Sequence, residues 1–139
     1  MKLVVGITGS TGVIYGIRLL EVLKKLGIET HLVMSEWAQK CITMETEYDP
    51  DYVKSLGTEV SDDVNMAASI SSGTHRTDGM IVIPCSMKTL SSVANGYDET
   101  LVARAAGVML KESRKLILVV RETPLTAINL ENMLKLARL

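Results

Sequence analysis

The sequence predicts an α/β fold in which a parallel β-sheet is covered by helices on both faces. Short apolar runs rich in β-branched residues occur at 2–8, 29–34, 79–84 and 115–120, and longer stretches with helical periodicity separate them. The first strand–helix–strand unit spans about 33 residues, the size of a βαβ unit. The chain has 139 residues, of which 47% are hydrophobic, so residues 1–139 suit a single domain with a sizeable core.

The first elements follow from apolar spacing and glycine punctuation. Residues 2–8 are apolar and end in a glycine-rich turn, as expected for a buried parallel strand. Residues 12–25 carry apolar side chains near a helical period and end in two lysines, which favours a helix. Gly27 then separates this helix from the strand predicted at 29–34.

Two capping signals follow the second strand. Ser35 is a good N-cap for a helix through Thr43, and Asp49–Pro50 is typical of another helix start. The stretch 55–77 is polar, rich in serine and weakly periodic, so we expect irregular structure with a short helix near 66–69.

The second half returns to regular alternation. We expect a strand at 79–84, helices at 86–94 and 99–112, a fourth strand at 115–120 and a final amphipathic helix at 125–139.

The bulk composition excludes several classes of protein. The net charge of −1 gives no reason to expect a nucleic-acid or anionic-membrane partner. The apolar run near the N-terminus is too short for a signal peptide or a membrane span. Cys41 and Cys85 lie far apart in apolar surroundings, which favours reduced thiols in the cytoplasm. Two distant histidines and two distant cysteines give no metal-binding spacing.

The strand ends are the places to look for a site, because parallel sheets bind ligands outside the carboxyl ends of their strands. The first strand is followed by the turn Gly6-Ile7-Thr8-Gly9-Ser10-Thr11-Gly12. Its glycines let the backbone approach a ligand, and the helix after it aims free N–H groups at an anion. This turn fits neither the GxGxxG nor the Walker pattern, so a plain turn that binds nothing is an equal alternative.

Polar residues follow the second and third of these strands as well. Ser35 is foremost a helix cap, although a capping hydroxyl at this edge can also touch a ligand. Ser86 and Thr89 stand in a turn at a helix start, where they can bond a ring edge or a phosphate. Cys85 beside them has no histidine placed near it, so a small buried thiol is favoured over a nucleophile.

Charged residues mark the end of the last strand and one helix. Arg121 and Glu122 directly follow the strand at 115–120, and a charged pair at the end of a buried strand is unusual. The alternative to a role in a site is an exposed ion pair in a loop, which adds little to stability. Arg104 and Lys111 are seven residues apart, so they share a helix face, either as surface charges or as a cationic patch.

Several segments in this order, among them VVGITGSTGVIYGIRLL, PCSMKTL, RAAGVMLKE and RETPL, resemble the flavoprotein family of UbiX-like flavin prenyltransferases and phenolic acid (hydroxyarylic acid) decarboxylase components. The resemblance extends over nearly the whole chain. It implies a Rossmann-like, flavodoxin-like sheet that holds FMN at its carboxyl edge. The FMN site that it implies comprises Gly9, Ser10, Thr11, Ser35, Ser86, Met87, Lys88, Thr89, Arg104 and Arg121.

The resemblance also implies an activity, that of a flavin prenyltransferase. Such enzymes transfer a dimethylallyl group from dimethylallyl phosphate to reduced FMN, and the prenylated FMN serves a UbiD-type aromatic acid decarboxylase. It implies that Arg121 and Lys111 stabilise the departing phosphate and that Glu45 and Glu122 transfer protons. Thr11 is expected to donate a hydrogen bond near flavin N5.

The family pattern also differs from this sequence in one respect. Relatives continue into another strand, a proline-rich turn and a terminal helix, which carry a tyrosine and a basic residue for the prenyl phosphate. Residues 1–139 lack that segment, so either the sequence is a truncated form or its prenyl-phosphate pocket is incomplete. The resemblance further implies a homo-oligomer, often a dodecamer, whose neighbouring subunits complete the site.

Two other functions remain open. One is an FMN-binding accessory subunit of a non-oxidative phenolic acid decarboxylase. The other is an FMN-dependent decarboxylase of the cysteine-decarboxylase type, which uses a histidine after a glycine-rich loop. His31 lies inside a predicted strand and His75 in the irregular segment, so neither histidine fits that second role.

Overall fold

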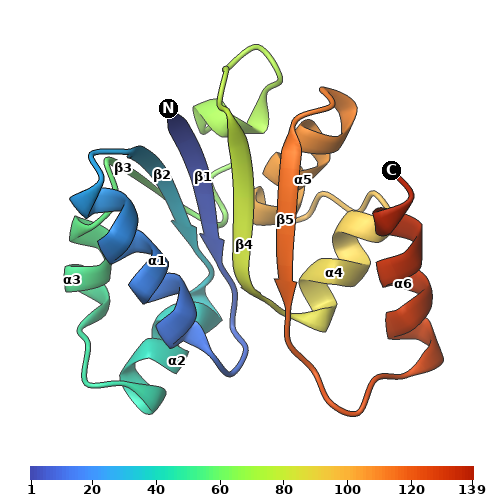
Figure 1. The fold of residues 1–139 in the computed structure, drawn as a ribbon, viewed down its shortest axis with the longest axis horizontal. Coiled ribbons are helices and arrows are strands. Elements are labelled where there is room, and N and C mark those ends of the chain that lie inside the picture. The colour runs from blue at the N-terminus through green and yellow to red at the C-terminus, as the bar shows by residue number, and fades with distance from the viewer.

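The computed structural model describes all 139 residues and contains one sheet of five parallel strands (Figure 1). The strands are β1 (Lys2–Ile7), β2 (Glu29–Met34), β3 (Glu59–Asp62), β4 (Gly79–Cys85) and β5 (Lys115–Val120). Their order in the sheet is β3-β2-β1-β4-β5, with β1 at the centre. This confirms the predicted α/β fold with a parallel sheet.

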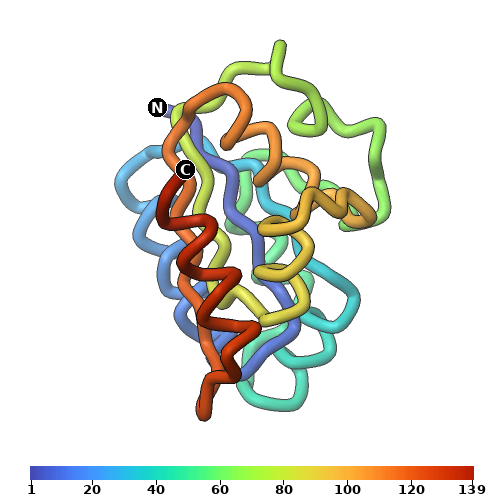
Figure 2. Tube along the Cα trace, turned by 90° about the vertical axis from the view of Figure 1, so that its right-hand side faces the viewer, coloured from blue at the N-terminus to red at the C-terminus, as the bar shows by residue number.

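Helices cover both faces of the sheet. On one face lie α1 (Val13–Lys25), α2 (Glu36–Glu45) and α3 (Pro50–Ser55). On the other lie α4 (Met87–Ala94) and α5 (Leu101–Lys111), and α6 (Ala127–Ala137) packs beside α4 (Figure 2). None of these helices has the length and apolar character that crossing a bilayer requires.

Alternation along the strands divides the core into two halves. Val5 of β1 and Leu32 of β2 pack against α1, α2 and α3, while Val4 and Val33 pack against α5. Successive side chains of a strand point to opposite faces, so these apolar runs serve both layers. This is why the central strands read as continuous apolar segments in the sequence.

The expectation for residues 55–77 was wrong in two respects. The segment contains the edge strand β3, and its helical turn is a 3-10 turn at Ser69–Ser71 rather than at 66–69. Three of the four residues of β3 are exposed, so this strand has no apolar run to reveal it. Pairing with β2 holds β3 in place, and this makes 115–120 the fifth strand rather than the fourth.

The chain order creates a switch point beside β1. The chain builds outward from β1 to β2 and β3, and then returns to place β4 on the other side of β1. The crossover connections on either side of β1 therefore diverge, which leaves a crevice outside the carboxyl ends of β1 and β4. The residues that follow these two strands are Thr8 and Ser86.

Candidate functional site

The carboxyl ends of four neighbouring strands are joined by backbone hydrogen bonds. The N–H of Ser35 donates to the carbonyl of Ile7 at 3.1 Å, so the end of β2 is joined to the end of β1. The N–H of Thr8 donates to the carbonyl of Pro84 at 3.3 Å, which joins β1 to β4, and the N–H of Arg121 donates to the carbonyl of Cys85 at 3.4 Å, which joins β5 to β4. We call the edge formed by the turn 8–12 and residues 35, 86 and 121 the carboxyl rim, which runs along the lower edge of the sheet in Figure 1.

The turn 8–12 leaves the start of α1 without a side-chain cap. Gly12 is the N-cap residue, and its φ of 105° lies in the left-handed region that favours glycine. The other five α-helices each have a side-chain cap, given by Ser35, Asp49, Ser86, Thr100 and Thr126. The first N–H groups of α1 are therefore available to an anion at the rim.

Ser10 provides a second sign of a ligand in this turn. Its Oγ atom is buried and has no hydrogen-bond partner in the protein. A buried hydroxyl without a partner costs about 1–3 kcal/mol, so such groups are uncommon in native structures. The arrangement of Ser10 beside an uncapped helix start fits a phosphate group.

The start of α4 adds further donors to the rim. The Ser86 hydroxyl accepts from the N–H of Thr89 at 3.2 Å and donates to Thr89 Oγ1 at 3.0 Å. The hydroxyl hydrogen of Thr89 thus remains free to donate. Met87 is half-buried and Lys88 is exposed in the same turn.

The charged residues after β5 do not form the ion pair considered above. Arg121 and Glu122 are both exposed, and none of the ion pairs of the chain includes either residue. Glu122 Oε1 instead accepts from the N–H of Thr123 at 3.1 Å. The Arg121 guanidinium is therefore left without an acidic partner at the rim.

The end of β2 places α2 on the same rim. The Ser35 hydroxyl accepts from the N–H of Ala38 at 3.0 Å, so its predicted capping role is confirmed. Glu45 is the exposed last residue of α2. Trp37, in the first turn of α2, lies against Gly9 of the turn 8–12. The sequence does not predict this contact, because the order of residues does not reveal which part of a turn meets which side chain of a helix.

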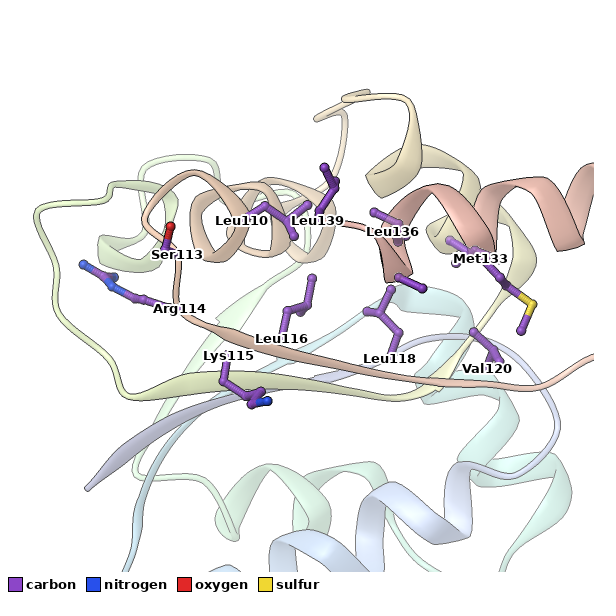
Figure 3. Close-up of a pocket in the computed structure, with 12 residues that line it drawn as sticks. Leu110, Ser113, Arg114, Lys115, Leu116, Leu118, Val120, Met133, Leu136 and Leu139 are labelled. Carbon is purple, nitrogen blue, oxygen red and sulfur yellow. The ribbon is translucent and has the colours of Figure 1, made fainter.

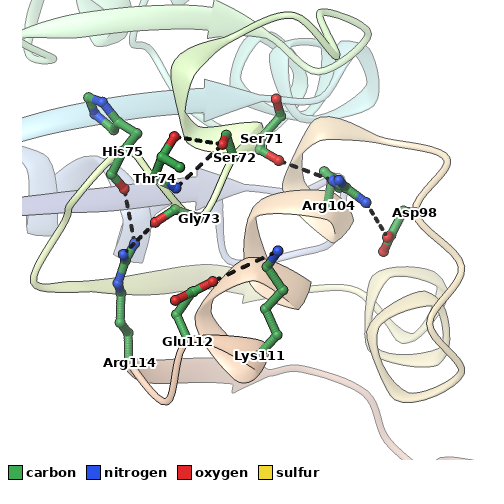
Figure 4. A network of polar contacts seen from close by, with 10 residues as sticks. All are labelled: Ser71, Ser72, Gly73, Thr74, His75, Asp98, Arg104, Lys111, Glu112 and Arg114. Carbon is green, nitrogen blue, oxygen red and sulfur yellow. Dashed lines mark hydrogen bonds and ion pairs between the residues drawn. The ribbon is translucent and has the colours of Figure 1, made fainter.

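Arg104 and Lys111 do not join the rim of their own chain. Lys111 ends α5 and precedes β5 by only a few residues, whereas Arg121 follows the other end of that strand. The six residues of β5 span about 20 Å, so the two ends are well apart. The Arg104 guanidinium donates to the carbonyl of Ser71 and to Oδ2 of Asp98 (Figure 4). The Nζ atom of Lys111 lies 3.8 Å from Oε1 of Glu112.

The cysteines are structural. Cys85 is fully buried, and burial raises the pKa of its thiol to about 12. Cys41 is also buried, and its thiol pKa is raised by burial and, to a smaller extent, by the nearby Glu45. The preference for a buried thiol at Cys85 is confirmed, since a thiol with such a pKa is not a nucleophile near neutral pH.

An apolar hollow lies elsewhere, between β5, α4, α5 and α6. It has a volume of about 740 Å³ and is mainly apolar (Figure 3). Leu116, Leu118 and Val120 form its floor on β5, and Met133 and Leu136 of α6 face it. It has few polar groups to orient a ligand, which separates it from the carboxyl rim.

Comparison with known proteins identifies the family of this chain. The family model described as Flavoprotein matches residues 1–139. A probable UbiX-like flavin prenyltransferase of Streptomyces sp. is 56% identical over the whole chain, which spans 70% of that relative.

Two solved structures share the fold closely. The crystal structure of AnUbiX in complex with FMN and dimethylallyl pyrophosphate is 52% identical, with a TM-score of 0.97 over 99% of this chain and 73% of that one. A dodecameric FMN-dependent UbiX-like decarboxylase from Escherichia coli is 55% identical, with a TM-score of 0.98 over 99% of this chain and 75% of that one. This chain therefore belongs to the flavoprotein family and, within it, to the UbiX-like flavin prenyltransferases.

Proposed function

We propose that this protein is a flavin prenyltransferase that binds FMN on the carboxyl rim and transfers a dimethylallyl group to it from dimethylallyl phosphate. The observation that carries the proposal is the pairing of an uncapped α1 with the buried, unpartnered hydroxyl of Ser10. Close relatives are flavin prenyltransferases, and one neighbour was solved with FMN and a dimethylallyl ester.

The residues of the rim fit FMN. Gly9, Ser10 and the N–H groups at the start of α1 are suited to the phosphate, which carries the negative charge that a helix start favours. Ser35, Ser86, Met87, Lys88 and Thr89 lie beside this turn along the same edge. Their hydroxyl, backbone and ammonium groups would bond the polar edge of the isoalloxazine ring. Arg121, at the end of the neighbouring strand, supplies a cation without an acidic partner.

When bound and reduced, FMN would supply N5 and C6 as the two nucleophilic atoms that the dimethylallyl group alkylates, with phosphate as the leaving group. The protein supplies orientation and charge. Arg121 neutralises the charge that develops on the departing phosphate, a form of stabilisation that acts chiefly in the transition state. Thr11 is exposed and free of a capping role, so its hydroxyl can hydrogen-bond near N5.

Two carboxylates are suited to proton transfer. Glu122 follows Arg121 after the end of β5, and Glu45 is the last residue of α2, the helix that Ser35 caps. Both are exposed and can reach solvent. We infer that one of them would donate a proton to the double bond of the allyl group and take up the proton lost from flavin C6, and that both would stabilise positive charge on the allyl group.

A second copy of the chain would complete the site. Arg104 and Lys111 lie away from the rim of their own chain, so Arg104 can reach FMN, and Lys111 the prenyl phosphate, only from a neighbouring subunit. A close structural neighbour is dodecameric. We therefore propose a homo-oligomer in which the outer face of α5 meets the rim of another copy.

The proposed product would act outside this protein. Prenylated FMN is a modified flavin that a separate decarboxylase of the UbiD type would receive as its cofactor. We propose this partner from the chemistry of the product. It follows that the protein must release the modified flavin intact.

The histidines argue against a cysteine-decarboxylase mechanism. His31 is buried within β2, and its Nε2 atom lies 2.7 Å from Ser61 Oγ. His75 lies in the segment that precedes β4, at the opposite edge of the sheet from the carboxyl rim. Neither imidazole stands beside the turn 8–12, where such a mechanism needs a proton donor.

The decisive test mixes the purified protein with reduced FMN and dimethylallyl phosphate under anaerobic conditions, followed by mass spectrometry of the released flavin. We expect a flavin heavier by one five-carbon prenyl group, together with inorganic phosphate. Bound but unmodified FMN would favour an accessory subunit. Release of carbon dioxide from an added acid, without a partner protein, would favour a decarboxylase. Either of these outcomes would overturn the proposal.

A further inference from the structure

Trp37 occupies an unusual position for the only tryptophan of the chain. The protein has no phenylalanine and only 4% aromatic residues, yet the largest side chain is 57% exposed. It stands two residues after the N-cap Ser35, in the first turn of α2. Since the end of β2 pairs with the end of β1, Trp37 lies beside the turn that follows β1.

The indole of Trp37 lies directly on the backbone of Gly9. A Cβ atom added to Gly9 would clash with Cδ1 of Trp37 and lie 2.7 Å from its Cβ and 2.8 Å from its Cγ. Nonbonded contacts of a Cβ atom essentially never fall below 3.0 Å, so any side chain at position 9 would displace either the indole or the turn. Gly9 is thus required for space, whereas Gly12 is required for its positive φ of 105°.

A second contact restrains the indole. The Nζ atom of Lys40, one helical turn further along α2, lies 5.0 Å from the centroid of the Trp37 ring. A cation within about 6 Å of an indole face is attracted to it. The ring is therefore held between α2 and Gly9, although most of its surface is in contact with solvent.

The residue that follows Gly9 is the one with the unpartnered hydroxyl. Ser10 donates its N–H to the carbonyl of Thr8 at 3.0 Å, and its buried Oγ has no partner. Holding Gly9 in place restricts the backbone directly before Ser10. A turn that is already ordered loses less entropy when it binds a ligand.

We propose that Trp37 is a positioning residue for the phosphate of FMN. By packing on Gly9, it holds the turn 8–12 in the conformation that presents Ser10 and the start of α1. The inference rests on the proposed function, because it takes FMN as the ligand. Trp37 acts through the turn and has no need to touch the flavin ring.

The test compares the affinities of FMN and riboflavin for the wild type, Trp37→Phe and Trp37→Ala. Riboflavin has the same ring but no phosphate. For Trp37→Ala, we expect the FMN dissociation constant to rise about tenfold, whereas that of riboflavin changes less than about twofold. Trp37→Phe should restore much of the FMN affinity. Tyr97→Ala, which removes another exposed aromatic residue beyond the end of α4 opposite to Ser86, should change neither constant.

A double-mutant cycle tests the contact with Gly9. Gly9→Ala in the wild type should weaken FMN binding about as much as Trp37→Ala does. In a Trp37→Gly background, which also removes the Trp37 Cβ that lies 2.7 Å from the added methyl, the same change should have little further effect. Circular dichroism of each variant checks that the fold is retained.

The possible failures are distinguishable. Equal losses of FMN and riboflavin affinity would mean that Trp37 contacts the ring, and this would overturn the inference while leaving the proposed function intact. Unchanged FMN affinity in Trp37→Ala, or additive effects in the cycle, would overturn it as well. A wild-type protein that binds neither flavin would overturn the proposed function, and the inference with it.

Discussion

The hydroxyl of Thr8 bridges the ends of two strands by donating to the carbonyl of Pro84 at 2.7 Å and accepting from the N–H of Ser86 at 2.9 Å. Thr8 is only 3% exposed, so both bonds are shielded from water. One side chain thereby fixes the first turn of α4 relative to the turn after β1. The two halves of the proposed FMN site meet at this point.

Replacing Thr8 with valine keeps the shape of the side chain and removes both hydrogen bonds. We expect the free energy of unfolding to fall by about 1–3 kcal/mol, because the N–H of Ser86 is left without a partner. FMN affinity should fall as well, since the start of α4 is released. Urea denaturation and flavin titration measure the two effects.

Thr8→Ser is the matched control, because it keeps the hydroxyl and loses only a methyl group. It should retain most of the FMN affinity. If valine and serine at position 8 weakened FMN binding equally, the bridge would have no role in arranging the site.

Stability should depend on pH through His31. This imidazole is buried, and burial lowers its pKa below the ordinary value of 6.5; Lys2 and His75 lower it further, while Glu59 opposes them. The unfolded chain therefore binds a proton more readily than the folded one. Stability conferred by neutral His31 is full above pH 6.5 and is lost as the pH falls through and below that value.

Urea denaturation between pH 8 and pH 5 measures this dependence. A His31→Gln variant should show a flatter profile in the same range, since it cannot take up the proton. The pKa of Asp63 is raised by burial, so this carboxyl acts with the opposite sign, but it is present in both proteins and its effect cancels in the comparison. Parallel profiles for the two proteins would disprove the role of His31.

The thiol of Cys85 should be inert in the folded protein. Its pKa of about 12 and its full burial predict no reaction with a thiol reagent at pH 8, and reaction only after unfolding. Cys85→Ala should retain prenyl transfer, although the small cavity lowers stability slightly. Loss of transfer in a well-folded Cys85→Ala protein would show that the thiol takes part in the chemistry.

Mixed oligomers test whether the site is shared between copies. Arg121→Ala and Lys111→Ala should each abolish most of the transfer activity when present alone. If each site takes Arg121 from one copy and Lys111 from another, random mixing restores about a quarter of the sites. Co-refolding followed by the prenyl-transfer assay measures the recovery. An absence of recovery, with oligomers intact, would place both residues on the same chain's site.

The sequence predicted most of the fold because the core strands are continuous apolar runs and the helices have clear caps. Ser35, Asp49 and Ser86 all cap helices in the structure, and Ser35 and Ser86 were expected to stand at helix starts beside strand ends. It missed β3, because an exposed edge strand such as Glu59–Asp62 is held by pairing with its neighbour and not by burial.

For the site, the sequence placed the residues after β1, β4 and β5 on a shared edge, because parallel strands end on the same side of a sheet. For Arg104 and Lys111 the sequence allowed two interpretations, ordinary surface charges or a cationic patch. Helical periodicity shows that the two residues share a helix face, but it does not show whether that face meets another copy of the chain. The contact between Gly9 and Trp37 could not be predicted either. These residues are separated by 27 others, and local sequence patterns do not show which distant residues touch.

The most direct test of the account is a crystal structure of this protein with FMN. We predict that the phosphate lies within hydrogen-bonding distance of Ser10 Oγ and the first N–H groups of α1, with the ring extending along the rim toward Ser86 and Arg121. A flavin seated instead in the apolar hollow between β5 and α6, with the turn 8–12 left empty, would contradict it.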